Sequence, residues 1–174
     1  MKMIMSLVAG ALGLGLLIAL AGYLYGPQRV WLLVAGEPDT GRVTLESLER
    51  TGRPNDALIA PEGRTALTPD AQPPVFNLPP ERLYAELVSL LEGQTGIDWA
   101  EQDETDRYLR FVTYSPTLRF PDLHHVWVLE TDSEETSTLA LYAGAQLGQS
   151  DLGKNRARLD QWLTELAERI DQGP

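Results

Sequence analysis

The sequence contains no cysteine and only two histidines. Without cysteine the chain can form no disulfide, and it offers no thiolate nucleophile or thiolate metal ligand. This absence suits both the cytosol and an exported location, so it leaves the compartment open. His124 and His125 are adjacent, and adjacent side chains of a strand face opposite sides of a sheet. They are a poor ligand pair for one metal ion, and we expect neither a metal site nor a cofactor.

Basic residues are also scarce: 14 Lys and Arg stand against 25 Asp and Glu, for a formal net charge of −11. Such a chain repels phosphate backbones, so nucleic-acid binding is not expected. Net charge likewise predicts no attraction to anionic lipid, so any membrane attachment should come from hydrophobic sequence. No glycine-rich phosphate loop and no catalytic spacing is recognisable, so no catalytic residue is assigned.

What the sequence does have is a long uncharged run near its start. Met3–Tyr25 lacks charge, proline, asparagine and glutamine. As a helix it would be about 34 Å long, close to the thickness of the hydrocarbon core of a bilayer. Tyr23, Tyr25 and Trp31 stand at its distal end, where aromatic rings favour the interface. We expect residues 1–25 to be a transmembrane anchor that contacts the lipid bilayer through residues 3–25.

A cleaved signal peptide is the alternative for the same segment. Ala19-Leu20-Ala21 fits the A-x-A pattern of a cleavage site before Gly22. The apolar run is longer than a usual signal-peptide core and continues past this site, which favours the anchor. Lys2 favours an N-terminus on the inside and Arg29 opposes it mildly. We therefore expect a single-pass protein of the bacterial inner membrane with a periplasmic C-terminal domain.

The uncharged run also contains small residues at a spacing of four, Ala11, Gly15 and Ala19. Such a stripe lets two helices approach closely, which would allow a homodimer or a membrane protein partner. The alternative is that small residues are simply common in membrane spans.

The middle of the chain is rich in proline. Eight of the twelve prolines lie in residues 36–80, and they exclude long helices there. Isolated apolar residues such as Leu58 and Phe76 are more than a pure linker needs. We expect residues 26–53 to be a tether and residues 54–79 to be an extended strap on the folded domain.

Residues 80–174 show the pattern of an α+β domain. The predicted elements are a helix from Pro80 to Gly93 or Gly96, strands at 97–101, 107–114, 124–130 and 137–143, and a helix from about Ser150 to Ile170. Short connections between the strands indicate an antiparallel meander. The predicted fold is thus an N-terminal transmembrane helix followed by a small antiparallel sheet of about four strands flanked by two helices.

The tail of the sequence resembles a known family. Gly148, Ser150, Asp151, Gly153, Asn155 and Arg158 match the spacing G-x-S-D-x-G-x-N-x-x-R. This motif, with weaker matches at Arg53–Leu58 and Phe120–Asp122, resembles the bacterial and plastid family called domain of unknown function 1499. The resemblance spans roughly residues 45–167 and implies the fold and topology of its membrane-anchored members, but no reaction. Ala143–Gln146 replaces the arginines and serine that usually precede the motif, so any anion binding based on them is lost or changed.

The same tail holds the best candidate for a polar site: Ser150, Asp151, Asn155, Arg156 and Arg158. One interpretation is a small-ligand pocket at a helix N-terminus, with an arginine as charge partner. The other is structural: Ser150 and Asp151 cap the helix, and Asn155 ties a loop to it. The sequence therefore predicts a membrane-anchored accessory or binding module without a defined reaction, and its alternative is an enzyme or small-ligand receptor that uses this cluster.

Overall fold

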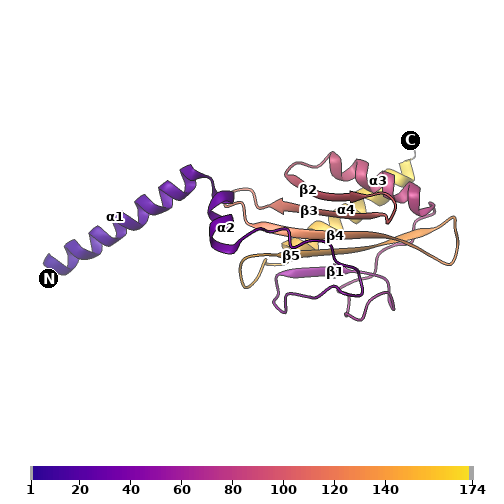
Figure 1. Cartoon of the computed structure of the whole chain (residues 1–174), viewed down its shortest axis with the longest axis horizontal. Coiled ribbons are helices and arrows are strands. Elements are labelled where there is room, and N and C mark those ends of the chain that lie inside the picture. The colour runs from indigo at the N-terminus through magenta and orange to yellow at the C-terminus, as the bar shows by residue number, and fades with distance from the viewer. Residues whose placement is uncertain (1, 173–174) are drawn as a thin grey trace.

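The computed structural model describes residues 2–172, except for the side chains of residues 2, 3, 9 and 18. Residue 1 of the expected anchor and residues 173–174 of the expected domain lie outside the described residues. Figure 1 shows one long helix that projects from a folded part containing both strands and helices.

The projecting helix is α1 (Lys2–Tyr25), and a short helix, α2 (Pro27–Ala35), follows it. Gly26 between them has a φ of 106°, which glycine adopts readily because it has no Cβ. Pro27 begins α2 at a position where a backbone N–H has no helical partner to lose. Ile4–Tyr25 is long and apolar enough to cross a membrane, and its most apolar stretch is not buried against the rest of the described chain. The prediction of one apolar N-terminal helix of spanning length is confirmed.

The folded part contains one antiparallel sheet in the order β1-β5-β4-β3-β2. Its strands are β1 (Asp56–Ile59), β2 (Ile97–Asp103), β3 (Tyr108–Tyr114), β4 (Pro121–Glu130) and β5 (Ser137–Ala145). The α+β class is confirmed. The expected number of four strands was too low, because the fifth strand, β1, comes from the proline-rich segment.

β1 forms an edge of the sheet by pairing with β5, from Asp56 opposite Gly144 to Ile59 opposite Leu141. β1 has only four residues and its partner lies far along the chain, so no local hairpin pattern marks it in the sequence. Further along the same segment, Phe76 pairs with Ser137 at the other end of β5. Residues 56–59 and Phe76 thus pair along β5, and turns and bends at 62–67 separate these two contacts.

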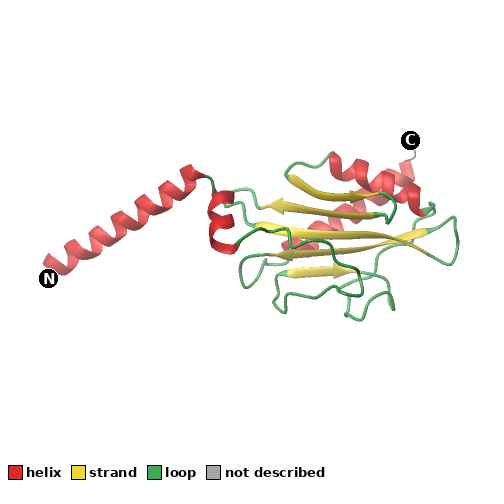
Figure 2. Cartoon of the chain, in the orientation of Figure 1, coloured by secondary structure: helices red, strands yellow, loops and turns green. Residues whose placement is uncertain are grey.

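Two helices, α3 (Pro80–Glu92) and α4 (Lys154–Gln172), cover one face of the sheet (Figure 2). Buried leucines of both helices meet Phe111 of β3 and Trp162 of α4 in the main core. α4 begins at Lys154 rather than near Ser150, because residues 150–153 form the loop that caps it.

The other face of the sheet carries a smaller core under residues 36–70. Leu45 and Leu48 of this segment are buried against Tyr108, Trp127 and Tyr142. Residues 26–53, expected as a tether, therefore hold α2 and two buried leucines. Adjacent side chains of β4 consequently enter two different environments, one under the helices and one under this segment.

Candidate functional site

Asp151 caps α4. One oxygen of its carboxylate accepts a hydrogen bond from the backbone N–H of Asn155 at 2.7 Å, and the other accepts from Gly153 at 3.0 Å. The Ser150 hydroxyl accepts from the backbone N–H of Leu152 at 3.1 Å. A carboxylate at this place satisfies free N–H groups and complements the positive end of the helix dipole. Both oxygens of Asp151 are thus engaged by the backbone.

Asn155 joins α4 to the loop before β1. Its side chain is fully buried, and its Nδ2 donates to the carbonyl oxygen of Asn55 at 3.2 Å. Asn55 is buried as well, and its Nδ2 donates to the carbonyl oxygens of Ala145 and Gly148 at 3.3 and 2.9 Å. Two asparagines therefore link three segments that are distant in sequence. A buried amide without such partners would be costly, so these bonds specify how the segments meet.

Arg158 extends the cluster toward β4. It donates to Asn155 Oδ1 at 3.0 Å and to Asp122 Oδ2 at 2.9 Å, and it lies 3.5 Å from His124 Nε2. Arg156 is turned away and binds Asp160 on its own helix. The structure therefore brings Asn155 and Arg158 together with Asp122 and His124, and it separates Arg156 from them.

The charges of this cluster are shaped by burial. Desolvation raises the pKa of Asp122 above its usual value, although the bond from Arg158 acts in the opposite direction. Desolvation also holds the pKa of His124 well below its usual value, and the positive charge of Arg158 adds to this effect. His124 is therefore neutral near pH 7, and its Nε2 lies 2.9 Å from the Thr113 hydroxyl. Its Nδ1 has no hydrogen-bond partner among the described residues.

Within the described chain, protein groups engage Asp151, Asn155 and Arg158. Such an arrangement stabilises the junction of β1, β4 and α4. The sequence prediction missed Asn55, Asp122 and His124. Two of them lie in Arg53–Leu58 and Phe120–Asp122, the weaker family matches, which were the available signal.

A cavity of about 310 Å³ lies on the opposite face of the sheet, between β4, β5 and part of the segment that covers them. It is lined by Pro38, Thr40, Val43, Ser47, Leu48, Glu49, Thr51, Leu123, His125, Tyr142, Gly144, Ala145 and Gln146. The lining is mainly apolar with a few polar groups, as in many small-molecule sites.

His125 of β4 is one of the polar residues that line this cavity. Its Nδ1 shares a 2.6 Å hydrogen bond with the Tyr108 hydroxyl. Burial lowers the pKa of His125 to about 4, and nearby Arg110 also lowers it. Burial raises the pKa of Tyr108 to about 12. Both groups are therefore neutral near pH 7, and His125 can offer a ligand one neutral ring nitrogen.

Tyr142 forms the floor beside His125. Its ring lies over Gly144, where a Cβ would stand only 2.6 Å from the tyrosine oxygen, so any larger residue at 144 would displace the ring. Burial and the neighbouring Asp56 carboxylate raise the pKa of Tyr142 above its usual value. From β4 and β5 the cavity thus receives neutral hydrogen-bonding groups, and the Glu49 carboxylate lines it from the covering segment.

Comparison with known proteins adds the family. A family model described as "Protein of unknown function (DUF1499)" matches residues 37–166. The chain belongs to this family. The match includes all five strands and α3 and leaves out α1 and α2. In this DUF1499 protein, the residues that resemble the family's tail motif are therefore those that cap α4 and anchor it to β1 and β4.

The comparisons with curated proteins and with solved structures do not assign a function. No curated protein has significant sequence similarity to the DUF1499 protein. Among solved structures, the crystal structure of TTHA0849 from Thermus thermophilus is 15% identical, with 55% of this chain and 86% of that chain covered and a TM-score of 0.27.

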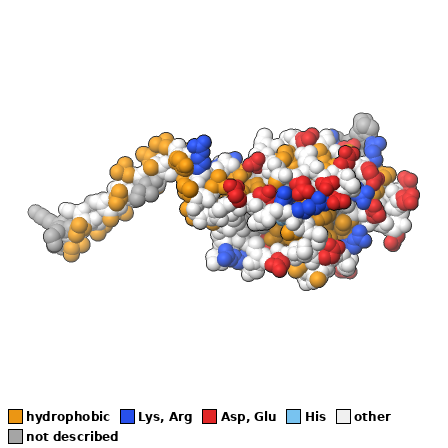
Figure 3. Space-filling view, in the orientation of Figure 1, with side chains coloured by type: hydrophobic (Ala, Val, Ile, Leu, Met, Phe, Trp, Pro, Cys, Tyr) orange, Lys and Arg blue, Asp and Glu red, His pale blue; other side chains and the backbone are white. Residues whose placement is uncertain are grey.

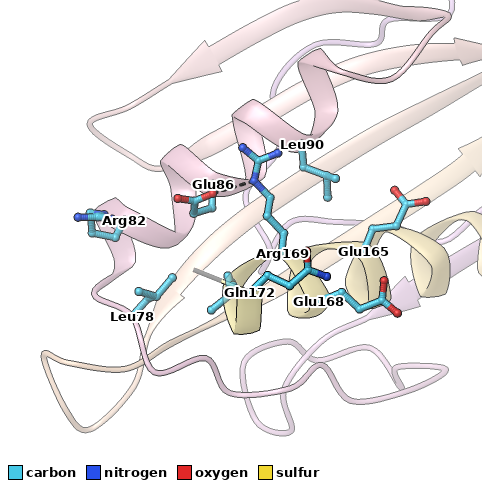
Figure 4. A pocket seen from close by; sticks show the side chains of 9 residues that line it. Leu78, Arg82, Glu86, Leu90, Glu165, Glu168, Arg169 and Gln172 are labelled. Atoms are coloured by element: carbon cyan, nitrogen blue, oxygen red, sulfur yellow. Dashed lines mark hydrogen bonds and ion pairs between the residues drawn. The ribbon is translucent and has the colours of Figure 1, made fainter. Parts of the chain in front are cut away.

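The DUF1499 protein has a further cavity of about 550 Å³ between α3 and α4 (Figure 4). Arg169 of α4 crosses it to reach Glu86 at 2.9 Å and the Ser89 hydroxyl at 2.7 Å. Glu165 and Glu168 also line this cavity. The paired charges join the two helices. Among the described residues, no group of three or more His, Asp or Glu side chains is placed to hold a metal ion.

Proposed function

We propose that this DUF1499 protein is a membrane-anchored accessory or binding module without a reaction of its own. The observation that carries the proposal is α1. Ile4–Tyr25 forms a helix of spanning length, and its most apolar stretch has no protein cover in the described chain. Large apolar side chains along it are more than half exposed, which is unfavourable in water and favourable in lipid.

The proposed location is the bacterial inner membrane, with the α+β domain in the periplasm. The support is the positive charge of Lys2 and the amino terminus, which favours an inside N-terminus, while Arg29 is a single opposing charge. The strongly acidic domain would then be exported behind the span.

The test is extraction and topology of the full chain expressed in a bacterium. We expect the protein to stay in the membrane pellet after alkaline carbonate washing. We also expect external protease to degrade the domain in spheroplasts but not in intact cells. Release by carbonate would contradict the anchor, and protection in spheroplasts would reverse the orientation.

A homodimer or a membrane protein partner remains part of the proposal, through Ala11, Gly15 and Ala19. These three positions are exposed in the isolated helix. Because the chain lacks cysteine, single cysteines can be scanned along α1 in membranes. Disulfide cross-links confined to the face of Gly15 are expected for a homodimer, and cross-links without a preferred face would exclude one.

A second candidate function is that of a small-ligand receptor, and the cavity beside His125 favours it. A mainly apolar wall with a neutral imidazole and one tyrosine suits a small, mainly apolar molecule that carries a hydrogen-bonding group. The capping cluster at Ser150–Arg158 offers less, because its main polar groups already bind protein.

The receptor function is tested by native mass spectrometry of the full chain purified in detergent. A bound molecule is expected as an extra mass that is lost in His125→Phe and kept in Asn155→Ala. Extra mass that is lost in Asn155→Ala and kept in His125→Phe would move the site to the capping cluster. Absence of any extra mass in the natural chain would contradict the receptor function and leave the accessory function as the remaining proposal.

A further inference from the structure

One end of the domain is built from three segments beside α1: α2, the loop 115–120 and the loop 146–153 (Figure 1). Trp31 of α2 donates from its indole nitrogen to the Leu118 carbonyl oxygen at 2.6 Å, and its ring packs at a tilt against Phe120 with ring centroids 4.8 Å apart. Gln146 donates to the carbonyl oxygens of residues 35, 36 and 37 at 3.1–3.2 Å. These contacts make the three segments one continuous surface, named here the proximal face.

The proximal face holds nearly all of the exposed large apolar side chains of the domain. Among described residues after α1, those side chains are Leu32, Leu33, Val34, Val75, Leu118 and Leu152. Only Val75 lies outside the proximal face. Leu33 is 78% exposed, Leu118 is 50% exposed and Leu152 is 86% exposed. Three separate segments thus direct leucines away from the core at the same end, which marks an interaction surface rather than scattered exposure.

The same face holds basic side chains that form no ion pair within the described chain. Most arginines elsewhere, such as Arg42, Arg50 and Arg107, are bound to carboxylates, and the exceptions among the described residues are Arg64 and Arg82. The unpaired ones at the proximal face are Arg29 of α2, Arg53, Arg119 and Lys154.

Arg53 belongs to the proximal face because its neighbour, the Pro54 carbonyl, accepts from the backbone N–H of Asp151. On the face drawn in Figure 3, acidic side chains are most numerous over the middle and far end of the domain, and a few lie at the end beside α1. Despite the net charge of −11, the end beside α1 thus carries four basic side chains without an ion pair.

We infer that the proximal face docks on an anionic phospholipid surface, in the same bilayer that α1 crosses. This inference rests on the proposed membrane anchor. Leu33, Leu118 and Leu152 enter the interfacial layer, and the unpaired basic side chains contact lipid phosphates. Exposed leucines combined with unpaired cations match this surface in both hydrophobicity and charge.

The short connection between α1 and α2 lowers the entropic cost of docking. Gly26 turns the chain between the span and α2, so the proximal face is delivered to the headgroup layer without a free linker. A connection of one residue gives the proximal face a higher effective concentration at the membrane surface than a long flexible tether would. The domain is consequently held in one orientation, with the turn between β4 and β5 directed away from the lipid (Figure 1).

The test uses the full chain in vesicles of phosphatidylcholine with or without phosphatidylglycerol. Because the chain lacks cysteine, Leu118→Cys, Leu152→Cys and Glu134→Cys each accept one polarity-sensitive fluorophore. Glu134 is an exposed residue of the turn between β4 and β5 and serves as the control. Lipids that carry a spin-label quencher near the headgroup should quench the labels at 118 and 152 at least several-fold more than the label at 134.

A charge variant tests the role of phosphate. Arg119→Glu with Lys154→Glu should reduce the quenching at 152 in vesicles that contain phosphatidylglycerol and should leave the label at 134 unchanged. Unchanged thermal unfolding of each labelled variant confirms that the domain is folded. Equal quenching with and without phosphatidylglycerol, unaffected by the charge variant, would overturn the phosphate contacts.

Two failures are distinguishable. If the chain resists carbonate extraction from the vesicles but the labels at 118 and 152 are quenched no more than the label at 134, docking is wrong and the anchor stands. Cross-links between two copies at 118 or 152 in that case would assign the face to a second copy. If carbonate releases the chain, the anchor itself is wrong.

Discussion

Single side chains decide how α4 meets the sheet. Asn155 is fully buried, and it exchanges hydrogen bonds with the Asn55 backbone and with Arg158. His124 and His125 stand side by side on β4, yet one lies under α4 beside Trp162 and the other lies under the covering segment beside Tyr108. At this scale the chemistry of each group follows from which face of β4 it occupies.

Replacing Asn155 by alanine should lower the free energy of unfolding by about 1 kcal/mol or more, because it removes the buried hydrogen bonds that its side chain makes to the Asn55 carbonyl and to Arg158. Chemical denaturation of the full chain in detergent measures this loss. Ser150→Ala is the matched control, since its exposed hydroxyl makes one bond to Leu152, and it should cost clearly less. Unchanged stability together with loss of a bound molecule would instead give Asn155 a binding role.

The histidines should make the domain sensitive to acid. The pKa of His125 is about 4 in the folded chain, against an ordinary value near 6.5. Between these two pH values, His125 is therefore protonated in the unfolded chain and neutral in the folded chain. The free energy of unfolding should therefore fall as the pH drops from about 6.5 to about 4, by about 3 kcal/mol for His125 at about 1.4 kcal/mol per pH unit. His124, whose pKa is also lowered, adds in the same direction.

The variant His125→Phe should flatten this dependence, and denaturation measured at a series of pH values compares the two slopes. Asp122 works the other way, because its raised pKa makes the folded chain bind a proton more readily than the unfolded chain in mild acid. Identical slopes in the natural chain and His125→Phe would show that His125 is not buried as a neutral group.

Among the elements, β1 depends most on contacts that are distant in sequence. Its Leu58 donates its backbone N–H to Asp70 Oδ2 at 2.8 Å, and its carbonyl accepts from the Asp70 backbone at 2.7 Å. Asp70 also binds Arg50, and this bond helps to hold its pKa below the usual value. β1 and the proline-rich segment after it are therefore stabilised as one unit.

Amide hydrogen exchange should reveal this unit. The amides of Leu58, Ala60 and Asp70 should exchange slowly, and those of the exposed turn at 62–64 should exchange rapidly, because only the former are bonded within the sheet edge. Asp70→Asn should accelerate exchange at Leu58 by roughly tenfold or more, the effect of about 1.4 kcal/mol on local opening. NMR of the chain in detergent follows these amides individually. Exchange at Leu58 as fast as at 62–64 would mean that the segment is a loose linker.

The whole molecule combines a helix suited to lipid with a folded domain suited to water. α1 runs without interruption from Lys2 to Tyr25, across the A-x-A pattern at residues 19–21. The domain is acidic in total but carries basic side chains without an ion pair at the end beside this helix, so its orientation relative to the membrane matters as well as its net charge.

The intact mass of the protein isolated from bacterial membranes should correspond to a chain that retains residues 2–21. The physical reason is that a span of this length is held in the bilayer and escapes cleavage at the A-x-A pattern. Mass spectrometry decides, with Ala21→Leu as a control that removes the pattern. A natural chain that begins at Gly22, together with an uncleaved Ala21→Leu, would establish a signal peptide.

Local patterns were enough to predict α1 from its uninterrupted apolar run, and α3, α4 and the four strands from β2 to β5 from apolar residues that recur or cluster over several neighbouring positions. The capping role of Asp151 was one of two interpretations that the tail motif allowed, and its hydrogen bonds now favour it. β1 escaped prediction, since four residues among prolines carry no repeat and β5 lies far along the chain.

The sequence by itself determined an apolar helix of spanning length and an antiparallel α+β fold, because length, hydrophobicity and alternation are local properties of the chain. Only the tertiary structure decided that Asn55 meets Asn155, that Arg158 meets Asp122, and that His125 faces a cavity. It also gathered Leu33, Leu118 and Leu152 at one end. Those neighbours are set by strand pairing and helix packing between distant segments, and no local pattern encodes which surfaces come together.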